Sequence, residues 1–126
     1  MLRTASELAA LRAEASAVRV AWLAAVSDGV MTPDDLLRFA ATPRGRALRK
    51  VRLDDLLKAT PGLSNRQVRS TMARLRMVCH VSPDKTLTVM WLLDARYGRP
   101  RARAWAVLSA QARTVAPGWP FVGAVR

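Results

Sequence analysis

The residues best suited to chemistry in this chain are arginines that follow a proline–glycine turn. The turn at residues 61–62 separates two short helical patterns, and Ser64 with Gln67 forms a capping box that opens the second helix. The first amides of a helix have no partner within it, and the helix dipole makes that end positive, so an anion fits there. Arginines beside such a site make a nucleic-acid phosphate the expected anion. They are Arg66, Arg69 and Arg74.

Charge is segregated along the sequence. Residues 1–42 carry four arginines and five carboxylates, a net charge of −1, whereas residues 43–126 carry a net charge of +13. A domain this basic repels itself unless it meets a polyanion, so nucleic acid is the expected partner. Eighteen of the 21 cations are arginine, whose planar guanidinium can hold a phosphate with two hydrogen bonds. The alternative is a soluble protein whose arginines reflect only a gene rich in G and C.

Composition indicates one domain without an enzymatic centre. The chain has 126 residues, 51% of them hydrophobic, which suits a single domain with a modest core. Cys79 and His80 are the only residues of their types, so a metal site lacks ligands. A cysteine nucleophile would have His80 as the only histidine that could act as its base. The carboxylates at 34–35 and 54–55 fall in first turns of expected helices, where the helix dipole accounts for them. We predict no cofactor, no metal and no enzyme activity.

The same features indicate where the protein works. No apolar run approaches the roughly 20 residues that a membrane span needs, and the N-terminus lacks the pattern of a secretory signal. A single cysteine excludes an internal disulfide, which fits a reducing compartment. The expected location is the cytoplasm, in association with the nucleoid.

Apolar spacing and helix-start signals predict an all-α fold. A capping box at Thr4, followed by apolar residues every three or four positions, predicts a long helix that ends near residues 27–29. Only residues 78–81 are expected to be extended. The remaining helices are expected at about 33–41, 43–48, 53–59, 65–77, 82–97 and 100–113. We therefore predict an N-terminal helix (1–28), a helical core with two extra C-terminal helices (29–114) and an irregular tail (115–126).

The apolar positions also predict which faces are buried. We expect the stripe of the long helix to pack on the rest of the domain, because only about three heptads are present for a coiled coil. The tryptophans at 22, 91 and 105 fall on helical stripes, so core packing explains them better than stacking on single-stranded bases. Trp119 and Phe121 in the tail either occupy a groove or stay mobile. The stripe of the long helix is Leu8, Leu11, Ala15, Val18, Trp22 and Ala25, and that of the last helix is Trp105, Val107 and Leu108.

A longer pattern carries a family resemblance: Lys50-Val51, then Leu56-Leu57, then Pro61-Gly62 and a basic helix. Residues 29–77, with the long helix before them, resemble the actinobacterial integration host factor family. Its members are small monomeric nucleoid-associated proteins with a helix-two-turn-helix domain. The resemblance implies that the turn and the start of the next helix bind the DNA backbone. The residues implicated are Gly62, Ser64, Asn65, Arg66 and Arg69.

Two departures from the family pattern bear on where DNA would bind. Ser64 stands where the family commonly has a second glycine, so the backbone approaches phosphate less closely. The arginine-rich stretch that the family has after this helix is missing, and basic runs lie instead at 96–103 and 44–50. Further phosphate contacts are therefore predicted for Arg44, Arg46, Arg49, Lys50, Arg99, Arg101 and Arg103.

One basic run contains a tripeptide that matches the core of AT-hook peptides, and the other contains a similar segment. These peptides lay an arginine along the floor of a narrow A·T minor groove. The matches are Gly98-Arg99-Pro100 and the similar Pro43-Arg44-Gly45-Arg46. The alternative for the first is that Gly98 ends one helix and Pro100 begins the next.

Together these features predict a monomeric all-α protein that binds duplex DNA through its backbone, as a nucleoid-associated or recombination-accessory factor. Two separate contact surfaces, the turn and one of the basic runs, would let it bend or bridge DNA. Structured RNA is an alternative ligand, because phosphate recognition at a helix start does not distinguish the sugars. The other alternative is an interaction module whose N-terminal stripe docks a recombinase or self-associates.

Overall fold

Capping boxes set where three of the helices begin. The computed structural model describes residues 4–114, and the side chains of Thr4, Thr32 and Ser64 each cap a helix start. Those helices are α1 (Ala5–Ser27), α2 (Pro33–Ala40) and α4 (Asn65–Val78). The other segments are the 3-10 helix η1 (Pro43–Lys50), α3 (Leu53–Ala59), α5 (Val89–Leu93) and α6 (Gly98–Thr114). The predicted all-α fold is confirmed for residues 4–114.

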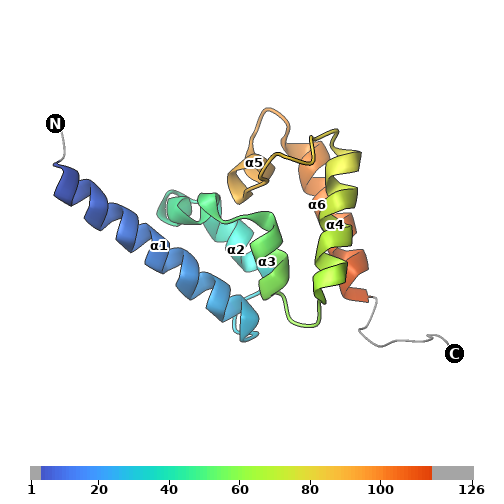
Figure 1. Cartoon of the computed structure of the whole chain (residues 1–126), viewed down its shortest axis with the longest axis horizontal. Coiled ribbons are helices and arrows are strands. Elements are labelled where there is room, and N and C mark those ends of the chain that lie inside the picture. Colours follow the sequence, from blue (N-terminus) through green and yellow to red (C-terminus); the bar gives the residue numbers. More distant parts are fainter. Residues whose placement is uncertain (1–3, 115–126) are drawn as a thin grey trace, which may run out of the picture.

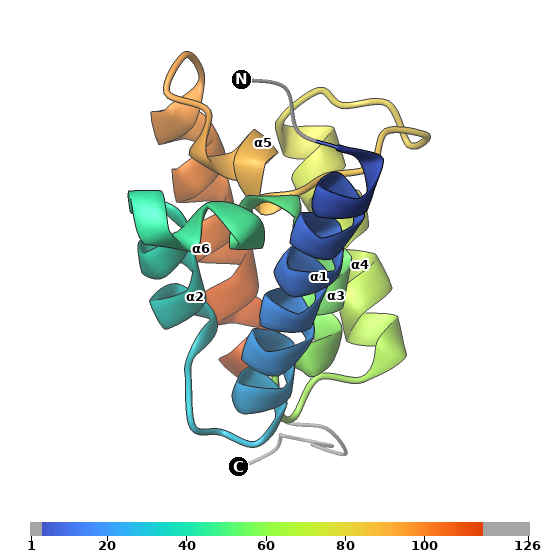
Figure 2. The same cartoon turned by 90° about the vertical axis from the view of Figure 1, so that its left-hand side faces the viewer.

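The helices form a body with α1 along one side and the α4–α6 pair at the other (Figure 1). α4 packs against both α3 and α6, and α6 runs in the opposite direction to α4. Seen from the α1 side, η1 and α2 lie on one side of α1, while α3 and α4 lie on the other (Figure 2). Within residues 4–114 no helix combines the length and the apolarity needed to cross a membrane.

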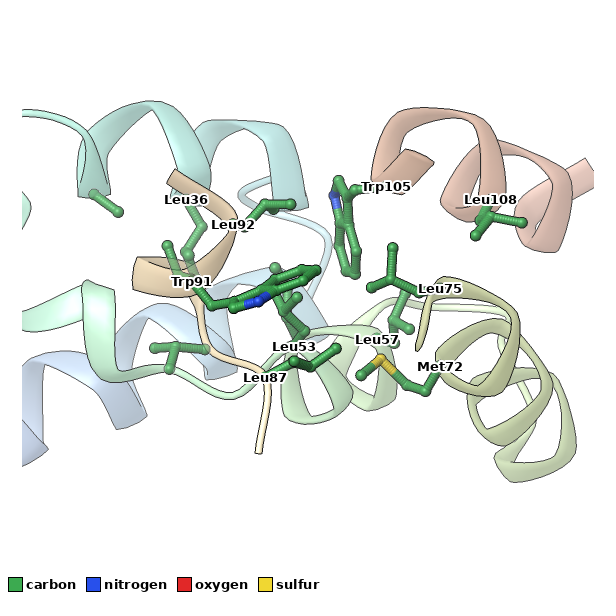
Figure 3. Close-up of a cluster of buried hydrophobic side chains, with 14 of the residues drawn as sticks. Leu36, Leu53, Leu57, Met72, Leu75, Leu87, Trp91, Leu92, Trp105 and Leu108 are labelled. Atoms are coloured by element: carbon green, nitrogen blue, oxygen red, sulfur yellow. The ribbon is translucent and has the colours of Figure 1, made fainter. Parts of the chain in front are cut away.

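The core is built mainly from leucines and two tryptophans. Leu53, Leu56 and Leu57 of α3 are buried, as their spacing predicts, and burial of each leucine contributes about 2 kcal/mol. Figure 3 shows Trp105 of α6 beside the leucines of α3 and α4, and Trp91 of α5 in the same cluster. The prediction that tryptophans form the core is confirmed for these two, and the half-buried Trp22 packs against the core. Its ring stacks on that of Phe39 with centroids 5.0 Å apart, joining α1 to α2.

The prediction of an extended segment at residues 78–81 is wrong. α4 continues through Val78 and closes with a Schellman motif, in which the Val81 amide donates to the Arg76 carbonyl at 2.9 Å. His80 takes the left-handed position of that motif, with φ 56°. The β-branched valines favour extended backbone, but the hydrogen bonds that satisfy the last helical carbonyls outweigh this preference.

His80→Gly is expected to raise the free energy of unfolding by about 0.5–1 kcal/mol. Glycine adopts positive φ without the steric cost that a Cβ imposes, and part of this gain is offset by the greater entropy of the unfolded chain. Urea unfolding followed by circular dichroism measures the change. His80→Ala keeps the Cβ and serves as the control, and an equal stabilisation by both variants would contradict this explanation.

The helix predicted from residue 82 begins only at Val89. The Leu53 amide donates to the Leu87 carbonyl at 2.9 Å, and the Val89 amide donates to the Val51 carbonyl at 2.8 Å. These bonds hold residues 87–89 in an extended bridge beside the start of α3, and spacing in so short an apolar run cannot distinguish this from a helix. α5 also ends early, at Leu93, and α6 begins at Gly98 rather than at Pro100.

Three apolar positions predicted to be buried are exposed. Leu8 and Leu11 are 39% and 42% exposed, because the first half of α1 extends beyond the body (Figure 1). The stripe of α1 packs on the domain only from Val18 onward, against η1 and α3. Val107 is 49% exposed, at the edge of the α4–α6 contact. Trp119 and Phe121, for which a groove was one alternative, lie outside the described residues.

Candidate nucleic-acid interface

The turn between α3 and α4 places an exposed glycine next to a helix start. Gly62 has φ +87°, and no atom lies within 4 Å of the position that a Cβ would occupy. The backbone angle therefore requires glycine, while the space beside it stays open to a ligand. On the protein side the turn is fixed, because the buried hydroxyl of Thr60 donates to the Leu56 carbonyl at 2.8 Å.

Two amides at the start of α4 are available to an anion. The Ser64 amide donates to the Gln67 side chain at 2.8 Å, and the Gln67 amide donates to the Ser64 hydroxyl at 3.1 Å. The Ser64 amide and hydroxyl are thus used in the capping box, and the hydroxyl proton is what Ser64 could still donate to a phosphate, so its role as a phosphate contact stays a prediction. The amides of Asn65 and Arg66 have no acceptor within residues 4–114, and they lie at the positive end of a 14-residue helix.

The three predicted arginines of α4 are all exposed, but they lie on two sides of the helix. Arg66 and Arg74 line a groove between α4 and α6. Arg69 lines a different groove, between α3 and α4. The α4 surface, defined here as Asn65, Arg66, Arg69 and Arg74, therefore spreads its cations around the exposed half of the helix.

Two cations of the α3–α4 groove were not singled out from the sequence. Lys58 and Arg76 line it beside Arg69. Arg76 lies seven residues after Arg69, which places both on one side of a helix, and this spacing could have identified it. The Arg76 guanidinium also donates to the Lys85 carbonyl at 3.0 Å and so holds the following loop.

One carboxylate, that of Asp54, lines the α3–α4 groove together with its cations, and it is paired with Arg52. The ion pairs of the described residues are Arg52 with Asp54, at 3.4 Å, and Arg96 with Asp94, at 3.0 Å. Hydrogen bonds from Arg96 hold the pKa of the Asp94 carboxyl below its ordinary value. Both pairs lie outside the α4 surface, whose arginines have no ion-pair partner in the part of the chain that the structure describes.

The basic run at 96–103 divides between buried and open positions. The half-buried Arg101 guanidinium lies 4.3 Å from the ring centroids of both Trp91 and Tyr97, and it donates to the Trp91 carbonyl at 2.9 Å. Arg101 therefore joins α6 to α5, and its assignment as a phosphate contact stays a prediction. Arg99 and Arg103 are exposed at the start of α6, beside the end of α4.

The run at 44–50 lies in η1 and is also split. Arg44, Arg46 and Lys50 are exposed, whereas the half-buried Arg49 donates to the Ala40 carbonyl at 2.8 Å and holds η1 to α2. The fold does not bring this run to the turn, because η1 packs against α1, α2 and α5 (Figure 1). The cations of η1 and of α4 thus form two separate surfaces.

Neither match to an AT-hook has the extended backbone that such a peptide needs. Residues 98–100 lie in α6 and residues 43–46 lie in η1. A Cβ on Gly45 would stand 1.9 Å from the Phe39 carbonyl oxygen, so close packing explains that glycine. Gly98 and Pro100 both lie in the first turn of α6, so Pro100 does stand at a helix start but Gly98 does not end a helix, as the alternative had it.

The remaining groups of residues 4–114 that could carry chemistry are the Cys79 thiol and the potential metal ligands. Burial raises the pKa of the Cys79 thiol above its ordinary value, which disfavours the nucleophilic thiolate further. No group of three or more His, Cys, Asp or Glu side chains within residues 4–114 is placed to hold a metal ion.

The described residues define a small all-α domain with an arginine-rich surface beside a helix start. Comparison of the chain with models of protein families, with curated proteins and with solved structures finds no match. The resemblance to the actinobacterial integration host factor family therefore stays a prediction from the residues quoted above.

Proposed function

We propose that this chain is an architectural protein that binds duplex DNA through the sugar–phosphate backbone, using the turn at 61–64 and the α4 surface. The observation that carries the proposal is that Arg66, Arg69 and Arg74 are exposed and have no ion-pair partner within residues 4–114. An exposed arginine without an ion-pair partner loses little free energy when it exchanges water for phosphate oxygens. The release of counterions from DNA favours this exchange. The resemblance to the integration host factor family supports the same function.

In the mechanism we propose, a phosphate accepts hydrogen bonds from the open amides of Asn65 and Arg66 and from the Arg66 guanidinium. Arg66 and Arg74 stand eight residues apart on α4, which corresponds to about 12 Å, so they contact different phosphates. Contacts of this kind position the protein on the duplex but carry no base information. Binding is therefore expected to depend little on sequence.

The exposed cations of η1 provide the second surface. Arg44, Arg46 and Lys50 belong to a part of the body separate from the α4 surface. A small protein with cations at two places contacts a curved duplex at both, or holds two duplexes together. Bending or bridging of DNA follows from this arrangement.

The proposal predicts a steep dependence of affinity on salt. If about six phosphates are neutralised, the logarithm of the association constant falls with the logarithm of salt concentration with a slope of about −5. Fluorescence anisotropy with a labelled duplex of random sequence, titrated at several salt concentrations, measures this slope. A flat response would contradict the proposal. An RNA duplex of matched sequence is the comparison, and tighter binding to RNA would instead favour the structured-RNA alternative.

A further inference from the structure

The first half of α1 is an amphipathic segment without a cover. Leu8 and Leu11 are exposed where α1 extends beyond the body (Figure 1). Glu7 and Glu14 stand four residues before and three residues after Leu11, which places both on the same edge of this apolar strip. Arg12 lies on the opposite edge. The projecting segment therefore has an apolar centre and one acidic side.

The groove between α4 and α6 has the complementary character. At the end nearer the start of α6, Val78 and Val107 are 57% and 49% exposed. Arg99 and Arg103 line the same part of the groove. No carboxylate of the described residues lines it. An apolar strip with arginines beside it fits a helix that carries leucines and acidic residues.

We propose that the first half of α1 from one copy of this chain docks in the α4–α6 groove of a second copy. Leu8 and Leu11 would cover Val78 and Val107, with the acidic edge of α1 facing the arginines of α6. A single chain cannot make this contact, because its α1 packs on α3 and η1 while its groove lies at the other end of the molecule (Figure 1).

The contact joins two different surfaces, so it does not close into a pair. Each copy keeps a free helix at one end and a free groove at the other, and further copies add in line. The interface is small, with ion pairs exposed to water, so the association is weak and favoured by high local concentration. Copies gathered on one duplex reach such concentrations, although the contact itself requires no DNA.

Sedimentation velocity on nucleic-acid-free protein tests the inference through two variants. The helix variant is Leu8→Gln/Leu11→Gln, which keeps good helix formers, and the groove variant is Arg99→Glu/Arg103→Glu. Wild-type protein is expected to increase in mean mass beyond a dimer as concentration rises, less so at high salt. Each variant alone is expected to associate at least about tenfold more weakly than the wild type.

Mixing the variants distinguishes a lost contact from a lost fold. The groove variant still has a normal α1 and the helix variant still has a normal groove, so the mixture should form one contact and stop at a dimer. Arg12→Ala changes the opposite edge of α1 and is the control that should associate like the wild type. Wild-type protein that stays monomeric, wild-type protein that stops at a dimer, a groove variant that still associates, or a mixture that does not pair would each overturn the inference. All these measurements are independent of DNA affinity.

Discussion

Arg66→Glu/Arg74→Glu is expected to weaken binding to a random-sequence duplex by about a hundredfold at low salt. Each substitution removes a charge-assisted contact to phosphate, worth about 1.5 kcal/mol, so the pair amounts to about 3 kcal/mol before repulsion is added. The salt slope should also become shallower by about 2, because two fewer phosphates are neutralised. Both side chains are exposed, so stability should change little. Anisotropy titrations at several salt concentrations measure both quantities.

The matched control changes the same net charge elsewhere on the molecule. Arg12 and Arg38 are exposed on α1 and α2, away from the turn. Arg12→Glu/Arg38→Glu should lower affinity less than about threefold, through the long-range field alone. Equal losses in the two double variants would mean that overall charge, and not the α4 surface, governs binding.

Local signals were sufficient to predict the helices around the candidate site. α3 spans Leu53–Ala59, as its leucine spacing predicts, and α4 begins at the position set by the Ser64–Gln67 capping box. Both features depend on residues within one or two helical turns, so they can be read from neighbouring positions. By contrast, the bridge at 87–89 depends on partners about 36 residues earlier, which no local pattern identifies.

The candidate site was predictable in composition but not in the environment of each cation. Arg66 and Arg74 are exposed as expected, whereas Arg101 lies between two aromatic rings and Arg49 is tied to a carbonyl of α2. Guanidinium groups carry the same charge in all four places. Whether a guanidinium meets water or an aromatic ring is decided by packing between helices, which the order of residues along one helix does not specify.

Gly45→Ala is expected to lower the free energy of unfolding by about 3 kcal/mol. The added Cβ would stand 1.9 Å from the Phe39 carbonyl oxygen and 2.8 Å from the Ala40 Cα. Both are backbone atoms at the end of α2, so a side-chain rotation cannot relieve the overlap and η1 must move away from α2. Urea unfolding followed by tryptophan fluorescence measures the loss, since Trp91 and Trp105 report on the core.

Gly29→Ala separates this overlap from the general cost of replacing a glycine. Gly29 has φ +77° and open space around the position of a Cβ, so the substitution should cost only about 1 kcal/mol of backbone strain. A Gly45→Ala variant no less stable than Gly29→Ala would mean that η1 does not pack tightly on α2.

If the larger loss is found, the same variant also tests the second DNA surface. Displacing η1 moves Arg44, Arg46 and Lys50 while leaving α4 in place. Below its unfolding transition, the Gly45→Ala protein should therefore still bind a single duplex but bend or bridge DNA less effectively.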